Sequence, residues 1–146
     1  MYFDPFTVSQ LTDEKIVEII TSSVAKCKPE AETVTELTEN IMYLTDVLFL
    51  YGEMRSRNQE RYSLLKYEND IKEKELVEEL KKASTEKKAA DFYKMEAAKQ
   101  MKKDMEAEFK AQGDVKRLEL AYDATQEKIN AVKKKIEALK YEFAAQ

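Results

Sequence analysis

Glycine and proline are almost absent from this chain, and their absence restricts its fold more than any other feature. The 146 residues contain two of each: Pro5, Pro29, Gly52 and Gly113. Relative to Ala, Gly destabilises a helix interior by about 1 kcal/mol and Pro by about 3 kcal/mol, so few positions here oppose helix. The sequence therefore predicts an all-α protein of a few long helices, packed as an antiparallel helical hairpin or coiled coil.

Composition argues against an enzyme. The chain has no His, no Trp and one Cys, while charged residues make up 37% of it, a profile typical of long helices. Without His, the Ser-His-Asp and Cys-His catalytic arrangements are excluded, and no glycine-rich phosphate loop is present. We expect Cys27 to pack as a small hydrophobic residue. The sequence predicts a protein that is not an enzyme and that needs neither a metal nor a cofactor.

Residues 1–28 are expected to form a short extended N-terminal arm followed by a short helix. Thr12 is a plausible N-cap for that helix, because its side chain can accept a hydrogen bond from the first turn. Three aromatic side chains on the arm need a surface to cover them, either on this chain or on a neighbouring subunit. They are Tyr2, Phe3 and Phe6.

Residues 29–112 are predicted to form a long central helical region. Pro29 suits the first turn of a helix, and from Val34 onward apolar residues recur every three or four positions as far as Tyr51. Beyond Gly52 the same stripe becomes polar. A possible joint lies at residues 84–85, and the sequence leaves open whether the helix runs through it.

Residues 113–146 are predicted to form a C-terminal coiled-coil helix, with Gly113 ending the helix before it and Asp114 as its cap. Lysines flank its apolar seam, so an acidic partner such as residues 68–80 suits it better than a parallel copy of itself. We therefore expect it to fold back antiparallel within one domain that assembles into a homo-oligomer of more than two subunits. The seam contains Val115, Leu118, Tyr122, Thr125, Ile129, Val132, Ile136, Leu139 and Phe143.

Basic and aromatic residues gather after residue 50, although the net charge of the chain is −4. The first 50 residues contain nine acidic and three basic side chains, whereas residues 81–103 contain eight lysines and three acidic side chains. Arginine binds phosphate and tyrosine stacks on unpaired bases, so this region is a candidate surface for single-stranded DNA. Its candidate residues are Arg55, Arg57, Arg61, Tyr62, Lys66, Tyr67, Lys81, Lys82, Lys87 and Lys88.

A purely structural interpretation of the arginines stays open. In that interpretation Arg55 and Arg61 form ion pairs with Glu53, Glu60 and Glu68 on a solvated helix face, and Tyr62 lies in the apolar seam. The lysines then serve solubility. Residue types alone do not choose between the two interpretations.

The end of the chain resembles the terminal helix of phage recombination mediators of the UvsY type. The resemblance rests on Tyr122-Asp123 and on the run Ile129-Asn130-Ala131-Val132-Lys133-Lys134-Lys135, followed by a further apolar helical turn. It implies a ring-forming homo-oligomer that binds single-stranded DNA and helps to load a recombinase, with a single-strand binding protein as a further partner. The sequence also predicts a cytoplasmic protein, in the host cell if it is phage-encoded, because a single Cys suits a reducing compartment. No membrane is expected, since no stretch approaches the ~18 apolar residues needed to cross one.

Two functions therefore follow from the sequence. The first is a non-enzymatic, single-stranded DNA binding recombination mediator. The second is a structural coiled-coil assembly protein, such as a phage scaffold or a core component of a phage particle. An acidic mimic of nucleic acid is disfavoured, because the acidic residues of 68–80 are interleaved with lysines.

Overall fold

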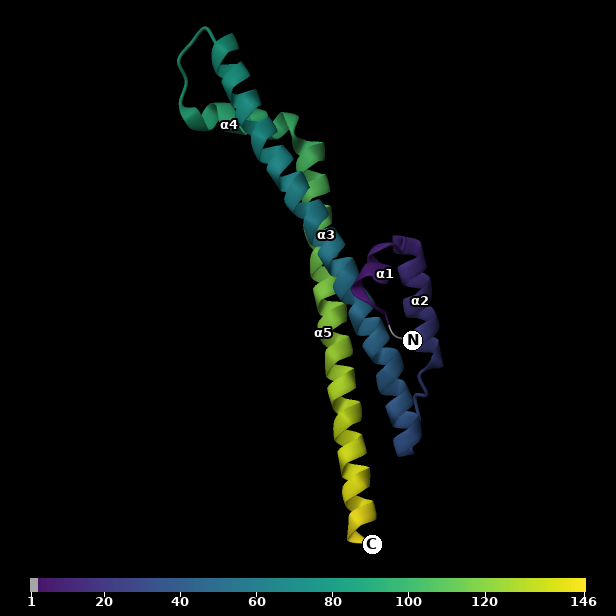
Figure 1. Ribbon diagram of the computed structural model, residues 1–146. Helices are drawn as coiled ribbons and strands as arrows, with labels where there is room; N and C mark the ends of the chain where they lie inside the picture. The colour runs from purple at the N-terminus through teal and green to yellow at the C-terminus, as the bar shows by residue number, and fades with distance from the viewer. Residues whose placement is uncertain (1–2) are drawn as a thin grey trace. The chain divides into compact units, whose positions relative to one another are not determined.

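The protein is helical throughout the part that the computed structural model describes, residues 3–146, and none of these residues lies in a strand. The helices are α1 (Pro5–Ser9), α2 (Asp13–Lys26), α3 (Val34–Ala83), α4 (Ala90–Gln100) and α5 (Lys102–Ala145) (Figure 1). The two long helices, α3 and α5, pack together. The prediction of an all-α fold is confirmed.

The N-terminal segment is not the extended arm that the sequence predicts, because residues 5–9 form helix α1. Pro5 occupies the first turn, where its missing N–H costs no intrahelical hydrogen bond. The Asp4 side chain caps the helix by accepting a hydrogen bond from the backbone N–H of Thr7 at 3.0 Å. Proline thus starts this helix rather than preventing it, and the helix buries Val8 completely.

Helix α2 has the predicted start and end. The Thr12 hydroxyl accepts a hydrogen bond from the backbone N–H of Lys15 at 3.2 Å, as an N-cap should. The helix ends at Lys26, before Pro29. Its Ile16 and Ile20 are buried against the neighbouring helices and form part of the core.

Helix α3 begins at Val34, so the prediction that Pro29 lies in its first turn is wrong. A reciprocal pair of bonds fixes the true start: Thr33 Oγ1 accepts from the N–H of Glu36 at 3.2 Å, and the Glu36 carboxylate accepts from the N–H of Thr33 at 3.4 Å. This is a capping box, which satisfies N–H groups that the first turn leaves unpaired. The capping box therefore determines where α3 begins, and Pro29, four residues before Thr33, does not.

Neither glycine ends a helix. Helix α3 continues through Gly52 to Ala83, and α5 continues through Gly113, so the predicted stop at Gly113 and the cap at Asp114 are wrong. No glycine in residues 3–146 has a positive φ angle, and a glycine without one fits an ordinary helix at a cost of about 1 kcal/mol. The breaks lie instead at residues 84–89, as the possible joint indicated, and at Met101.

The chain divides into two compact units: unit 1 is Met1–Ser56 with Arg117–Gln146, and unit 2 is Arg57–Lys116. Helices α3 and α5 contribute to both. In unit 1, α1 and α2 pack beside the first part of α3 (Figure 1). The centre of this packing is a cluster of buried apolar residues: Val8, Ile16, Ile20, Val47 and Leu50.

Unit 2 is held together by polar and small residues as much as by apolar ones. Its buried residues include Tyr93, Ala97 and Met101, at intervals of four along α4 and the turn after it. Asn69 of α3 is also buried, and its side-chain N–H groups donate to the backbone carbonyl of Asp104 at 3.1 Å and to the Glu108 carboxylate at 3.2 Å. The core of unit 2 therefore contains few apolar side chains.

Candidate nucleic-acid interface

Arg55, the first arginine of the predicted DNA-binding segment, lies against the protein itself. In unit 1 its guanidinium lies over the ring of Tyr122, 4.7 Å from the ring centroid. Gly52 also lies beside this ring: a Cβ there would be 3.5 Å from Cε2 of Tyr122, an ordinary van der Waals distance. Arg55 is thus used to join α3 to α5 in unit 1.

The rest of this Arg–Tyr segment, residues 57–67, belongs to unit 2. Some of its side chains have interaction partners, and others are exposed to solvent. Arg57 and Arg61 both have interaction partners in the structure, and Tyr62 is half-buried. Lys66 and Tyr67 are exposed, with 65% of Tyr67 accessible. Arg61 is exposed as well, although it has an interaction partner. The structure therefore does not gather these side chains into one open surface.

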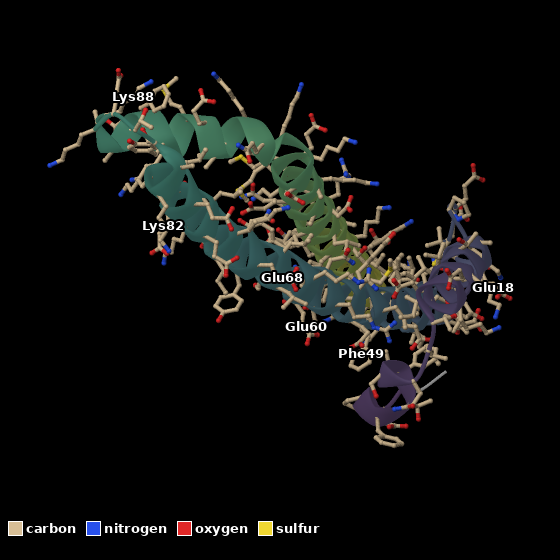
Figure 2. All side chains as sticks on the ribbon, turned by 90° about the horizontal axis from the view of Figure 1, so that it is seen from above. Glu18, Phe49, Glu60, Glu68, Lys82 and Lys88 are labelled. Atoms are coloured by element: carbon tan, nitrogen blue, oxygen red, sulfur yellow. The ribbon has the colours of Figure 1, made fainter. Side chains whose placement is uncertain are left out.

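The predicted lysines lie together at the end of unit 2 formed by the α3–α4 loop. Lys81 and Lys82 are in the last turn of α3, and Lys87 and Lys88 are in the loop of residues 84–89. All four are exposed. Figure 2 labels Lys82 beside the last part of α3 and Lys88 beside the start of α4.

A cavity of about 620 Å³ opens within this cluster. Lys81, Lys87 and Lys88 line it, whereas Lys82, the neighbour of Lys81, does not. The remaining lining comes from the loop and the start of α4, and consists of Ser84, Thr85, Glu86, Ala90 and Tyr93. The lining thus has three ammonium groups and one carboxylate.

Tyr93 gives the loop its shape. Its hydroxyl donates to the backbone carbonyl of Glu86 at 3.2 Å and accepts from the backbone N–H of Lys88 at 3.4 Å. Ser84 Oγ donates to the same Glu86 carbonyl at 2.6 Å. Three hydrogen bonds therefore hold the chain between the end of α3 and the start of α4.

The loop surroundings are electropositive. A hydrogen bond to the Ser84 side chain, followed by the N–H of Lys88, lowers the pKa of Tyr93, and the charges of Lys88 and Lys81 act in the same direction. The Lys88 ammonium lies over the ring of Phe92, 4.2 Å from its centroid. The Phe92 ring in turn meets Tyr93 edge-on, with centroids 5.6 Å apart.

Sequence reasoning missed Tyr93, the residue that organises this cavity. The available signal was the spacing of four between Tyr93, Ala97 and Met101, which marks the buried face of a separate helix. The sequence predicts one long central helical region here, with a possible joint at residues 84–85. That prediction does not identify α4 as a separate helix.

Unit 1 offers a second, apolar surface. A cavity of about 390 Å³ is lined by residues that include Pro5, Leu48, Phe49, Gly52 and Tyr122. Phe49 is 40% exposed (Figure 2). This surface is mainly aliphatic and aromatic, so it suits another apolar side chain rather than a charged ligand.

The predicted packing residues occupy unit 1, and their burial varies along α5. Ile129 is buried, and half-buried positions are Phe3, Leu118, Tyr122, Val132, Ile136 and Leu139. Phe6 and Phe143 are exposed, at 75% and 70%. Tyr2 lies outside the described residues.

Cys27 has the environment of an unreactive thiol. Its Sγ lies 3.6 Å from the backbone carbonyl of Ser23, to which it can donate, and burial raises its pKa. A raised pKa lowers the thiolate fraction at neutral pH, and the thiolate is the nucleophile.

Other kinds of site have no support in residues 3–146. These residues contain no group of three Cys, Asp or Glu side chains placed to hold a metal ion. Over the same range, none of the helices combines the length and apolar character that crossing a bilayer requires.

No protein-family model matches this chain, and a search of curated proteins and of solved structures found no match either.

Proposed function

We propose that this protein binds single-stranded DNA without catalysing a reaction, and that it does so through the lysine-rich end of unit 2, residues 81–103. One observation supports this choice above the others: eight lysines and three acidic residues lie in a segment that contains the lysine-lined cavity. Within this segment Lys99 meets Glu96 at 2.9 Å, and elsewhere in unit 2 Lys72 meets Asp104 at 2.6 Å. A local excess of cations is what a phosphate backbone requires.

The proposed contact surface differs from the one that the Arg–Tyr segment indicated. Arg55 would have to leave the ring of Tyr122 to reach a phosphate, and that contact helps to join two helices of unit 1. Lys66 and Tyr67 remain in the proposal, because both are exposed and a tyrosine ring can stack on an unpaired base.

We also propose a homo-oligomer built from antiparallel pairs of α3 and α5. Within unit 1, Lys135 donates to the backbone carbonyl of Ala31 at 2.7 Å and Tyr122 meets Gly52; within unit 2, Asp104 meets Asn69. In these pairs the α5 residue number falls as its partner's number rises, which supports an antiparallel pairing. The exposed Phe6, Phe49 and Phe143 support contact between copies.

The proposed cellular role is that of a recombination mediator in the cytoplasm. It rests on the resemblance of the C-terminal helix to UvsY-type mediators, together with a DNA-binding oligomer. Its partners would be a recombinase and a single-strand binding protein. An oligomer would present several lysine-rich ends to one strand, and linked sites bind far more tightly than single ones.

DNA binding is tested by fluorescence anisotropy of a labelled single-stranded oligonucleotide at two salt concentrations. We expect the triple variant Lys82→Gln, Lys87→Gln, Lys88→Gln to bind at least about tenfold more weakly. The slope of its salt dependence should fall by about 0.7 for each phosphate that the variant no longer neutralises. The matched control removes three exposed lysines of α5 in unit 1: Lys128→Gln, Lys133→Gln, Lys134→Gln. Equal weakening in the two triple variants would contradict the assigned surface.

A structural assembly protein is the second candidate, and the apolar cavity beside Phe49 favours it. This candidate predicts an oligomer whose mass is a multiple of 17.0 kDa in light scattering, together with no DNA binding even at low salt. A monomer at micromolar concentration would contradict it and would also contradict the homo-oligomer proposed above.

A further inference from the structure

The lysine-lined cavity of unit 2 has the features of a site for one compact anion. Lys81, Lys87 and Lys88 surround it from two different elements, the end of α3 and the α3–α4 loop. Within the described residues, no carboxylate forms an ion pair with Lys81 or Lys87. These two ammonium groups are therefore available to a ligand.

The backbone at the start of α4 adds hydrogen-bond donors. The N-cap residue is Ala89, which provides no side-chain hydrogen bond to the first turn, unlike the caps of α1 and α2. The N–H of Phe92 donates to the backbone carbonyl of Ala89 at 3.0 Å, so the donors that this turn can offer are the N–H groups of Ala90 and Asp91. Such a helix end attracts anions because its N–H groups and the helix dipole both favour negative charge. Here the uncapped end of an eleven-residue helix adjoins a cavity that is already lined by lysines.

Two acidic residues reduce the positive charge of the site. Glu86 lines the cavity, and Asp91 lies in the first turn of α4. The carbonyl of Glu86 is occupied by the hydroxyls of Ser84 and Tyr93, so the loop is held while the three lysines surround the opening. The lining has a net charge of about +2 when the lysines are protonated.

We propose that this cavity binds a phosphate monoester, and that its ligand is the 5′-terminal phosphate of a DNA strand. A monoester has a charge between about −1.5 and −2 at pH 7, whereas each internal phosphodiester has one negative charge. The dianion matches the charge of the lining, and a strand end can enter a concave site more readily than the middle of a strand. The inference rests on the DNA binding proposed above and gives it a preferred position at strand ends.

The test compares two oligonucleotides of one sequence, both labelled at the 3′ end, one with a 5′-phosphate and the other with a 5′-hydroxyl. We expect the phosphorylated strand to bind about tenfold more tightly, as charge-assisted hydrogen bonds to one group allow. Lys81→Gln should remove this preference. Lys82→Gln is the matched control, because Lys82 is the next residue and does not line the cavity; it should weaken both strands equally and keep the preference.

The outcomes separate this inference from the proposed function. Equal binding of the two strands by the unaltered protein would overturn the strand-end site and leave DNA binding intact. Loss of the preference in Lys82→Gln would overturn the assignment to the cavity. Binding of neither strand would overturn the proposed function itself. In competition, inorganic phosphate should displace the phosphorylated strand only at much higher concentration, and competition at equal concentration would overturn the strand end as the ligand.

Discussion

The two units of this chain are built from the same kinds of helix but are stabilised in different ways. Of the buried apolar residues in the described part of the chain, nine belong to unit 1 and four to unit 2. Unit 1 has a third element, α2, that covers the apolar face of α3, whereas unit 2 relies on the buried amide of Asn69 and on α4. A long helix thus gains a core only where another element covers it.

The units also differ at the starts of their helices. Side-chain caps begin α1 and α2 in unit 1, and a capping box begins α3. Helix α4 in unit 2 begins at Ala90, and its N-cap residue, Ala89, provides no such cap. In unit 1 the polar side chains therefore complete the starts of the helices, while in unit 2 the start of α4 has no side-chain partner.

Leu50→Ala should have the largest effect on the free energy of unfolding, and it tests whether unit 1 depends on its apolar core. Leu50 is fully buried in the unit 1 cluster, so its truncation should lower the free energy of unfolding by about 2–5 kcal/mol. Leu64 lies on the same helix in unit 2 and is 57% exposed, so Leu64→Ala should change it by less than about 0.5 kcal/mol. Urea denaturation followed by circular dichroism at 222 nm measures both. Similar losses would show that unit 2 has a larger core than we infer.

The two buried asparagines provide a second comparison with smaller effects. Asn40 in unit 1 accepts from the N–H of Lys28 and donates to its carbonyl, both at 2.8 Å, so Asn40→Ala leaves two backbone groups unpaired and should cost about 1–3 kcal/mol. Asn69→Ala in unit 2 removes only donors and should cost about 0.5–1.5 kcal/mol. Hydrogen exchange resolves the two units separately. A larger loss of stability for Asn69→Ala than for Asn40→Ala would mean that unit 2 depends on its buried asparagine more than unit 1 depends on Asn40.

The smallest expected effect is the pH dependence of the α3 capping box. Hydrogen bonds from the N–H of Glu32, then the Lys28 side chain and the N–H of Thr33, lower the pKa of Glu36 from its ordinary value of 4.5. Because the pKa in the folded protein is lower than in the unfolded chain, the carboxylate stabilises the fold above pH 4.5, and this contribution is lost as pH falls through the lower folded value.

Glu36→Gln should therefore lower the thermal midpoint slightly at pH 7, and it should lower the midpoint less at pH 3, because the contribution of the carboxylate falls below pH 4.5. Thermal melts of the two proteins at both values measure this. Thr33→Ala removes the other half of the capping box without changing a charge, so its effect should persist at low pH. A Glu36→Gln difference that stayed the same at pH 3 would contradict the assignment of the lowered pKa to this contact.

Much of the fold could be predicted from local patterns, and the errors have identifiable causes. The apolar period predicted the helices, and the Thr12 cap predicted the start of α2, because both depend on neighbouring residues alone. The predictions for Pro5 and Pro29 were wrong for a shared reason: a proline is compatible with the first turn of a helix but does not require one there. The residues that decided the matter were Asp4, which caps α1, and Thr33 with Glu36, which begin α3.

The candidate site was harder to predict than the fold. The sequence itself gives the positions of the lysines along the chain, and their role as a binding surface stays a prediction. It could not show that Arg55 lies on Tyr122, far along the chain, or that Tyr93 folds the loop that brings Lys81 beside Lys87. Contacts between residues far apart in the sequence leave no local pattern.

The sequence by itself determined that the chain is helical and that its cations gather after residue 50, because the scarcity of Gly and Pro and the order of charges are fixed by composition. Only the tertiary structure decided where the helices end and which cations remain available. Gly52 and Gly113 lie inside helices because neither position needs a positive φ angle. Whether a residue ends a helix, packs against another residue or is available to a ligand depends on the neighbours that folding brings to it.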